Sequence, residues 1–128
     1  MKLLLDTHVL LWALGEPERL SRLARLAIED PANLRLVSSA SAWEIAIKHR
    51  LGRLPGAQVV LEGYDRHLKR LRATELPIAS HHAILAGGLP HPHRDPFDRM
   101  LAAQAMLEGA IVVSNDRALE VLGARRIW

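Results

Sequence analysis

Two short apolar runs, far apart along the chain, each lead into an aspartate. Asp6 directly follows Leu3-Leu4-Leu5, and Asp116 comes shortly after Ile111-Val112-Val113. Such runs are typical of buried strands, and the segments between them carry helical apolar spacing, so we predict an α/β fold with a mainly parallel sheet. Open α/β folds bind ligands at the carboxyl ends of their strands. Both aspartates are therefore expected at a ligand-binding edge of the sheet.

The rest of the chain continues this alternation, with glycine, proline and serine marking where segments begin and end. We expect one domain over residues 1–128, with four or five short strands flanked by helices. Aromatic residues make up only 4% of a chain that is 49% hydrophobic, which favours aliphatic helices packed on a small sheet over an all-β fold. The expected strands are 2–5, 34–37, 75–78, 110–113 and 125–128, and the expected helices lie near 9–14, 21–28, 40–51, 58–73, 80–86, 98–108 and 116–122.

Composition excludes several kinds of site. The chain has no cysteine, which rules out disulfides, thiolate zinc sites and cysteine catalysis and agrees with a cytoplasmic location. Asp6 interrupts the apolar opening far short of a signal peptide, and no stretch is long enough to span a membrane. The formal net charge of +3 is mildly favourable for contact with a polyanion but diagnoses none.

Two further acids are expected at the same edge of the sheet. Glu44 falls in the first turns of the helix after the second strand, and Asp98 lies at the start of a later helix. Each has an ordinary alternative, because Asp98 could be a helix-start charge and Glu44 could pair with Lys48, which is worth only ~0.3–0.5 kcal/mol. Their agreement with Asp6 and Asp116 favours a shared site. Crowded carboxylates raise one another's pKa until a cation neutralises them, which predicts a divalent-metal site.

A specific resemblance is carried by LLLDTHVLLWAL, SSASAWEIAIKHRLGRL, HRDPFDRMLAAQA and IVVSNDRAL. These segments resemble, in the right order and over essentially the whole chain, the motifs of PIN-domain ribonucleases, most of all the VapC toxins of prokaryotic toxin–antitoxin pairs. The resemblance implies a metal-dependent endoribonuclease that leaves a 5′-phosphate and a 3′-hydroxyl, forms a homodimer and is inhibited by an antitoxin protein. It also implies that the family's acidic set is complete here, as Asp6, Glu44, Asp98 and Asp116.

Roles for these residues follow from their chemistry. Oxygen-only ligation suits Mg²⁺ or Mn²⁺, so Asp6, Asp98 and Asp116 are the expected metal ligands. A metal lowers the pKa of bound water and stabilises charge on phosphate, so no protein nucleophile is needed. Glu44 is expected to bind through water or to orient it. The supporting residues Thr7 and Ser114 are expected to hydrogen-bond and position the carboxylates, or to serve only as caps.

The segment HRDPFDRM contains two acids, and either could line the cleft. Pro96 disfavours helical geometry at Asp95, the residue before it, whereas Asp98 can project from the start of a helix. We therefore assign Asp98 to the metal and Asp95 to the loop.

Basic residues supply possible RNA contacts. Arg94 and Arg99 flank Asp98, and arginine makes directed contacts with phosphate. Lys69 and Arg70 belong to the basic amphipathic helix expected over 58–73. Ordinary solvated charge is the alternative for all four.

Other residue types carry weaker hypotheses. Seven histidines invite a zinc interpretation, but the adjacent pair His81-His82 points in different directions on a helix and no four-ligand set is clear. His8 and His93 lie beside the acids and either contact phosphate or serve in packing. The tryptophans Trp12 and Trp43 lie in apolar patterns and are expected in the core or at a partner contact.

Two other functions remain alternatives. One is a non-catalytic RNA- or protein-binding module on the same fold. The other is a phosphotransfer receiver with an acidic Mg²⁺ pocket, which needs a phospho-acceptor on a central strand and a suitably placed lysine, and whose acids come in a different order.

Overall fold

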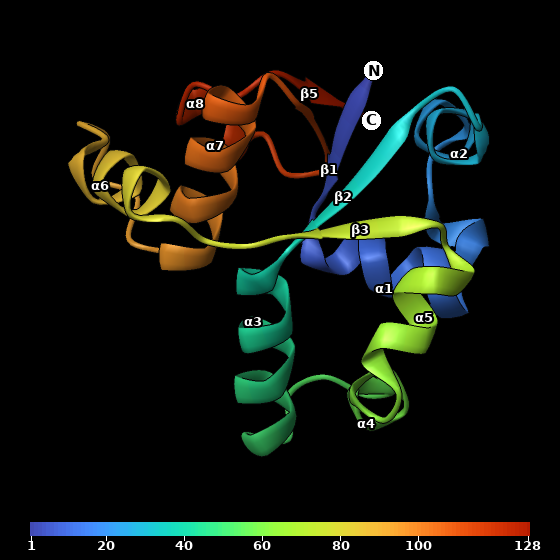
Figure 1. The fold of residues 1–128 in the computed structure, drawn as a ribbon. Coiled ribbons are helices and arrows are strands. Elements are labelled where there is room, and N and C mark those ends of the chain that lie inside the picture. Colours follow the sequence, from blue (N-terminus) through green and yellow to red (C-terminus); the bar gives the residue numbers. More distant parts are fainter.

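The computed structural model describes residues 1–128, and its centre is a five-stranded sheet. Every neighbouring pair of strands is parallel, and the strand order is β3-β2-β1-β4-β5 (Figure 1). The predicted α/β class with a mainly parallel sheet is confirmed. The strands are β1 (Lys2–Leu5), β2 (Leu34–Ser38), β3 (Ala73–Leu76), β4 (Ile111–Val113) and β5 (Arg126–Ile127).

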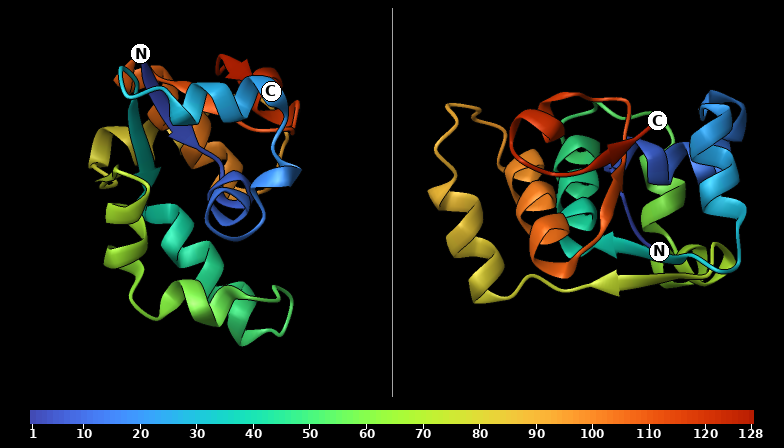
Figure 2. Two further views of the ribbon diagram at one scale, coloured as in Figure 1. Left: turned by 90° about the vertical axis from the view of Figure 1, so that its right-hand side faces the viewer. Right: turned by 90° about the horizontal axis from the view of Figure 1, so that it is seen from above.

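Helices cover both faces of the sheet, as the view from above in Figure 2 shows. Leu3 and Leu5 of β1 pack with the first helices of the chain, whereas Leu4 points to the opposite face and packs with the last ones. This alternation gives the sheet an apolar core on each side. None of the helices is both long and apolar enough to cross a membrane. They are α1 (Thr7–Gly15), the 3₁₀ turn η1 (Pro17–Arg19), α2 (Arg22–Glu29), α3 (Ser39–Arg50), α4 (Ala57–Leu61), α5 (Tyr64–Arg70), α6 (Ser80–Gly88), α7 (Pro96–Glu108) and α8 (Ala118–Val121).

The strand order reverses beside β1. From β1 the chain moves outward through β2 to β3, and then returns through α6 and α7 to place β4 on the other side of β1. The connections therefore diverge at the carboxyl ends of β1 and β4, which is where this class of sheet opens a crevice. Asp6 follows β1 there, and its backbone N–H donates to the carbonyl of Val113 at 3.1 Å.

The region before β3 differs from its prediction. The single helix expected over 58–73 is two short helices, α4 and α5, because Gly63 between them has a left-handed φ of 74°. Arg72 also has a left-handed φ, 53°, which ends α5 and lets β3 begin at Ala73, two residues before its expected start. Basic residues at 66–72 therefore lie on a short helix and the turn after it.

Candidate active site

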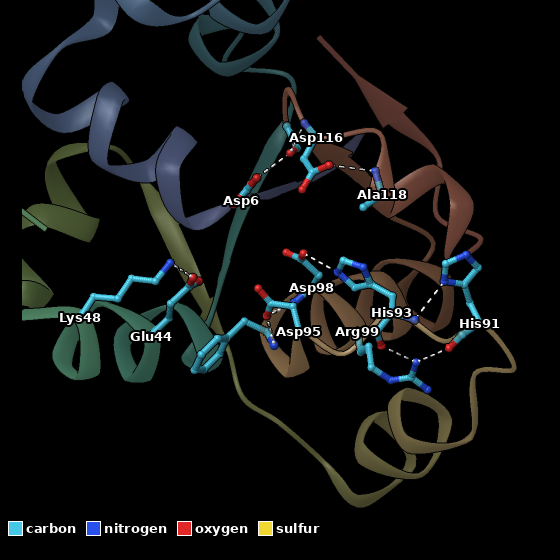
Figure 3. Close-up of polar contacts among 12 residues, drawn as sticks. Asp6, Glu44, Lys48, His91, His93, Asp95, Asp98, Arg99, Asp116 and Ala118 are labelled. Carbon is cyan, nitrogen blue, oxygen red and sulfur yellow. Dashed lines mark hydrogen bonds and ion pairs between the residues drawn. The ribbon is translucent and has the colours of Figure 1, made fainter. Parts of the chain in front are cut away.

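An acidic cleft of about 550 Å³ opens at the carboxyl edge of the sheet. It contains the four acids that the sequence singled out, contributed by residues next to β1 and β4 and by helices α3 and α7 (Figure 3). Trp12 is its single hydrophobic lining residue. The full lining is Asp6, His8, Trp12, Arg19, Glu44, Lys48, Asp95, Asp98, Asn115 and Asp116.

Asp6 is a buried acid at the floor of this cleft. It forms the N-cap of α1, where Oδ1 accepts a long hydrogen bond of 3.4 Å from the N–H of His8. The hydroxyl of Ser114 donates to Oδ2 at 2.5 Å. Burial raises the pKa of Asp6, the contacts with Ser114 and His8 lower it, and the charge of Glu44 raises it further.

Ser114 joins the two strand-end aspartates. It is completely buried, and while it donates to Asp6 its Oγ accepts a hydrogen bond from the N–H of Asp116 at 3.0 Å. The expected contact between Ser114 and a carboxylate is therefore present. Asp116 is exposed, and its Oδ1 accepts from the N–H of Ala118 at 2.9 Å, which turns the chain toward α8.

Asp98 projects from the first turn of α7 into the cleft. Its Oδ2 lies 2.8 Å from Nε2 of His93. The pKa of Asp98 is raised to about 6, first by burial and then by the nearby charges of Asp95, Asp6 and Asp116, against the lowering effect of the hydrogen bond with His93. The aspartates are thus close enough for the charge of one to disfavour the charge of another.

Asp95 lies in the loop before α7, and it also lines the cleft. Its backbone is non-helical, with φ −67° and ψ 112°, and it forms the N-cap of α7. Its Oδ1 accepts hydrogen bonds from the N–H groups of Phe97 at 2.8 Å and Asp98 at 3.3 Å. This cap holds the start of α7, and hence Asp98, at the edge of the cleft.

Glu44 differs from the aspartates because its charge is paired. It is buried in α3, and Lys48 one turn later donates to its Oε2 at 2.5 Å. The ion pair with Lys48, which was the ordinary alternative to a functional role for Glu44, is therefore present. It lies inside the cleft, since both residues line the cleft. Glu44 thus combines an ion pair with a place in the shared site.

Asp6, Asp98 and Asp116 have a common hydrogen-bonding pattern, which Asp95 shares because only its Oδ1 accepts hydrogen bonds. In each, the protein engages one carboxylate oxygen at short range: Oδ2 of Asp6, Oδ2 of Asp98 and Oδ1 of Asp116. The other oxygen has only the long contact from His8 in Asp6, and no hydrogen bond in Asp98 or Asp116. A set of open carboxylate oxygens fits a hard divalent cation such as Mg²⁺ or Mn²⁺. The acids do not form a group with ligand atoms all within 4.8 Å of one another.

Two expected roles need correction. Thr7 is buried, but its hydroxyl donates to Oγ of Ser41 at 3.0 Å, which ties α1 to α3 and contacts no carboxylate. Of the two places expected for Trp43, the core is wrong and a partner contact stays a prediction: the side chain is 59% exposed and packs edge-on against Phe97 with the ring centres 5.2 Å apart. Trp12 is half-buried and lies between Trp128 and His8.

The expected RNA-contacting residues lie in different environments. Arg94 and Lys69 are exposed and make no side-chain hydrogen bond or ion pair. Arg70 is exposed, donates to the carbonyl of Leu14 at 3.3 Å and lines a groove of about 560 Å³ that adjoins the acidic cleft. Arg99 instead points away from the cleft into the loop before α7, where all its donors face backbone carbonyls.

Arg19 is a cleft residue that sequence reasoning missed. It lies in η1, with its guanidinium 4.7 Å from the centre of the Trp12 ring and its Nη1 3.4 Å from Oε2 of Glu16. It lines both the acidic cleft and the adjoining groove. Nothing in the local sequence marks it, because its position depends on how η1 folds back over α1.

The histidine pair on α6 does gather possible metal ligands. His81, His82 and Glu108 have ligand atoms within 4.8 Å of one another. Nδ1 of the buried His82 accepts from the N–H of Ala79 at 3.0 Å, and its Nε2 lies 2.8 Å from Oε1 of Glu108. A neutral imidazole that accepts at Nδ1 carries its proton at Nε2, so it donates to Glu108 and neither nitrogen is free for a metal.

Comparisons with known proteins agree with this architecture. The sequence matches the family model of the PIN domain over residues 3–124. Ribonuclease VapC22 of Mycobacterium tuberculosis is 33% identical over 118 residues, which cover 91% of this chain and 88% of that protein. Ribonuclease VapC16 of the same organism is 36% identical over 73 residues, or 52% of each chain.

Solved structures with the same fold include two toxin–antitoxin assemblies with DNA. VapBC2 from Rickettsia felis, bound to a DNA fragment from its promoter, matches with a TM-score of 0.71 at 15% identity, over 99% of this chain and 98% of that chain. DNA-bound VapBC from Salmonella typhimurium matches with a TM-score of 0.65 at 20% identity, over 100% and 97%. At these identities the matches show a shared fold. Together with the family match and the curated relatives, they show that this chain is a member of the PIN-domain family, of the VapC type.

Proposed function

We propose that this protein is a divalent-metal-dependent endoribonuclease and the toxin of a toxin–antitoxin pair. The observation that carries the proposal is the common pattern of Asp6, Asp98 and Asp116, three aspartates from separate elements that each present an open carboxylate oxygen to one cleft. The relatives VapC22 and VapC16, both named ribonucleases, support the same activity.

The three aspartates would hold Mg²⁺ or Mn²⁺. When bound, a divalent cation lowers the pKa of water and compensates negative charge on the scissile phosphate. Ser114 keeps the Asp6 carboxylate and the Asp116 backbone in register, so two of the ligands are preset by one buried hydroxyl. Glu44 would hydrogen-bond water in the cleft, and its ion pair with Lys48 would hold its carboxylate in one orientation.

RNA would approach from the open side of the cleft. Three exposed basic residues would contact the phosphate backbone: Arg94 in the loop before α7, and Lys69 and Arg70 on α5. None of them is in an ion pair, and Arg70 donates one hydrogen bond, to the carbonyl of Leu14. Such contacts would position a polyanion whose charge the acidic floor alone repels. Single-stranded or unpaired RNA is the substrate class proposed.

Two protein partners belong to the proposal. An antitoxin is proposed because the structural neighbours are VapBC complexes, including those from Rickettsia felis and Salmonella typhimurium. A homodimer is proposed from the family resemblance of the sequence motifs.

The alternatives are less well supported. The phosphotransfer receivers of the flavodoxin-like class have strand order 2-1-3-4-5, whereas the order here is 3-2-1-4-5. A non-catalytic binding module would have no need for a complete acidic set with open oxygens. The receiver fold is therefore excluded, and the binding module becomes one outcome of the activity test.

The test is cleavage of a labelled single-stranded RNA set by the purified chain with Mg²⁺, with Mn²⁺ and with EDTA. The expected result is 5′-phosphate fragments with either metal and none with EDTA, and a loss of at least about 100-fold in Asp6→Asn and Asp116→Asn. Asp65→Asn, which removes an exposed acid of α5, is the matched control and should cleave like the parent. Full cleavage in EDTA, or by Asp6→Asn, would contradict the proposal.

A further inference from the structure

Arg99 makes an unusual set of contacts for a residue next to a candidate metal ligand. Its guanidinium has five N–H donors. Nε donates to the carbonyl of Ala86 at 2.9 Å, and the two terminal nitrogens donate to four more carbonyls. The other acceptors are His91 at 2.8 Å, His93 at 3.0 Å, Gly87 at 3.3 Å and Leu89 at 2.7 Å. No donor of Arg99 is left for a phosphate.

These five carbonyls belong to the end of α6 and to the loop that leads into α7. The carbonyls of Ala86 and Gly87 lie in the last turn of α6, where a helix has no backbone donors left and favours positive charge. The other three lie in 89–93, which has no helix or strand of its own. A single side chain of α7 therefore holds the end of α6 and the segment 89–93 through five backbone carbonyls.

His93 is the residue of this loop whose side chain contacts the carboxylate of Asp98. Arg99 holds its backbone carbonyl at 3.0 Å, and its N–H donates to Nδ1 of His91 at 3.1 Å. With the backbone held on both sides, the ring is directed so that Nε2 lies 2.8 Å from Oδ2 of Asp98 (Figure 3). Asp98 and Arg99 are adjacent in sequence but point in different directions. His93 contacts both of them, Asp98 through its ring and Arg99 through its backbone carbonyl.

We propose that Arg99 and His93 are positioning residues that set the orientation of the Asp98 carboxylate for metal binding. The hydrogen bond from His93 holds Oδ2, so that Oδ1 is the oxygen presented to the cleft. Arg99 acts one step further back, by holding the loop that carries His93. Hydrogen-bonding partners that orient a metal ligand typically contribute 10–100-fold in affinity. This inference rests on the proposed metal site at Asp98.

A lysine cannot replace Arg99 in this role. Its ammonium has three donors on a flexible chain, whereas the planar guanidinium reaches five acceptors arranged around it. Charge alone therefore does not explain the residue, and Arg99→Lys tests geometry at constant charge.

The experiment measures Mn²⁺ affinity of the purified protein at one fixed pH, from the electron paramagnetic resonance signal of free Mn²⁺, with a melting curve for each variant. His93→Ala should weaken Mn²⁺ binding about 10–100-fold. His93→Gln should recover part of the loss, because its amide N–H can donate to the same oxygen. Arg99→Lys should weaken binding as well, and the double variant should bind no more weakly than His93→Ala, because both changes act through one contact.

The controls separate this inference from the metal site on which it rests. His49→Ala removes an exposed histidine of α3 and should bind Mn²⁺ like the parent. Unchanged affinity in Asp98→Asn would overturn the metal site itself, and the positioning roles with it. Loss of affinity in Asp98→Asn, but parental affinity in folded His93→Ala, would overturn the positioning roles alone. His93→Ala tests the contact between the His93 ring and Asp98 even if Arg99→Lys does not fold. The variant keeps the backbone carbonyl to which Arg99 donates.

Discussion

Two regions of the molecule gather possible metal ligands. In one region the ring nitrogens of His82 are hydrogen-bonded within the protein, and in the other each aspartate keeps a largely open oxygen. On α6 and α7, His82 pairs one ring nitrogen with a backbone N–H and the other with Glu108. At the carboxyl edge of the sheet, Asp6, Asp98 and Asp116 each keep an oxygen with little or no hydrogen bonding. The first cluster is the tighter of the two, yet it is the second that has ligand atoms to offer.

The two clusters differ in how far contacts within the protein already use the hydrogen-bonding capacity of their ligand atoms. The His82 cluster is a helix-start contact, in which the third residue of α6 reaches back to the N–H at the N-cap. In the acidic cleft, burial is the main cause that raises the pKa values of Asp6 and Asp98, and the charges of neighbouring acids raise them further. We therefore expect unpaired charge and open oxygens to indicate a cation site better than short distances between ligand atoms do.

The largest effect is expected within the acidic cleft itself. Asp98→Asn replaces a charged ligand by a neutral one and should reduce metal-dependent RNA cleavage at least about 100-fold. Asp95→Asn should cost much less, because an asparagine oxygen can still cap α7. Cleavage rates of the two purified variants check this ranking. The reverse order would exchange the roles of the two aspartates.

At the other cluster the expected effect is on stability and not on metal binding. His82→Ala leaves the N–H of Ala79 without its partner and should lower the free energy of unfolding by about 1–3 kcal/mol. His81→Ala removes an exposed ring and should change it much less. Chemical denaturation with and without Zn²⁺ provides the measurement. A Zn²⁺-dependent gain in the parent that His81→Ala abolishes would make this cluster a metal site after all.

A smaller effect is expected on α5, outside the acidic cleft. Replacing Lys69 and Arg70 with alanine should weaken RNA binding and reduce its salt dependence by about 1.4 in log–log slope, if both contact phosphates of a single strand. Mn²⁺ affinity should not change, because neither residue lines the acidic cleft. Binding titrations over a range of salt concentrations test this. An unchanged dependence of RNA affinity on salt concentration would show that Lys69 and Arg70 are ordinary surface charges.

The smallest effect concerns an unpaired polar group that lies outside any charged cluster. The hydroxyl of Tyr64 is buried without a hydrogen-bond partner, and the pKa of Tyr64 is raised to about 12, first by burial and then by the charges of Glu75 and Asp65. The folded state thus resists ionisation more than the unfolded state, so this contribution to stability is fully present below about pH 10 and is lost as the pH rises toward 12.

Tyr64→Phe should therefore have equal or slightly higher stability than the parent near neutral pH and lose less of it above pH 10. Above pH 10, the loss of unfolding free energy should be smaller in the variant than in the parent by about 1 kcal/mol, since solvent partly screens the ring. Urea denaturation at pH 8 and pH 11 measures it. If the stability difference between the parent and Tyr64→Phe is the same at both pH values, the tyrosine ionises as readily in the folded protein as in the unfolded chain.

Much of the fold and the meeting of the acids could be predicted from the sequence. Parallel strands bring their carboxyl ends to one edge whatever the loops do, so Asp6 and Asp116 had to converge once β1 and β4 were recognised. Local signals were equally dependable: Ser21, a serine directly before a helical apolar pattern, caps α2 by accepting from the N–H of Ala24 at 3.0 Å.

Features set by packing could not be predicted in the same way. Gly63 is compatible with a continuous helix in the apolar pattern, and only tertiary structure gives it the left-handed conformation that separates α4 from α5. Arg99 resembled a phosphate contact because it follows Asp98. On a helix, however, neighbouring side chains diverge, and its five acceptors come from a loop and another helix.

The measurement that tests the metal site most directly is a pair of melting curves, in chelator and in excess Mn²⁺, for the parent and Asp98→Asn. Metal that binds only the native state stabilises it by RT ln(1 + [L]/Kd), so the parent should melt at a higher temperature in Mn²⁺. Asp98→Asn should melt at or above the parent in chelator, because one of the repelling charges is gone, and should gain little from Mn²⁺. A parent indifferent to Mn²⁺, together with a variant strongly destabilised in chelator, would make Asp98 a structural residue of α7 and contradict the shared metal site.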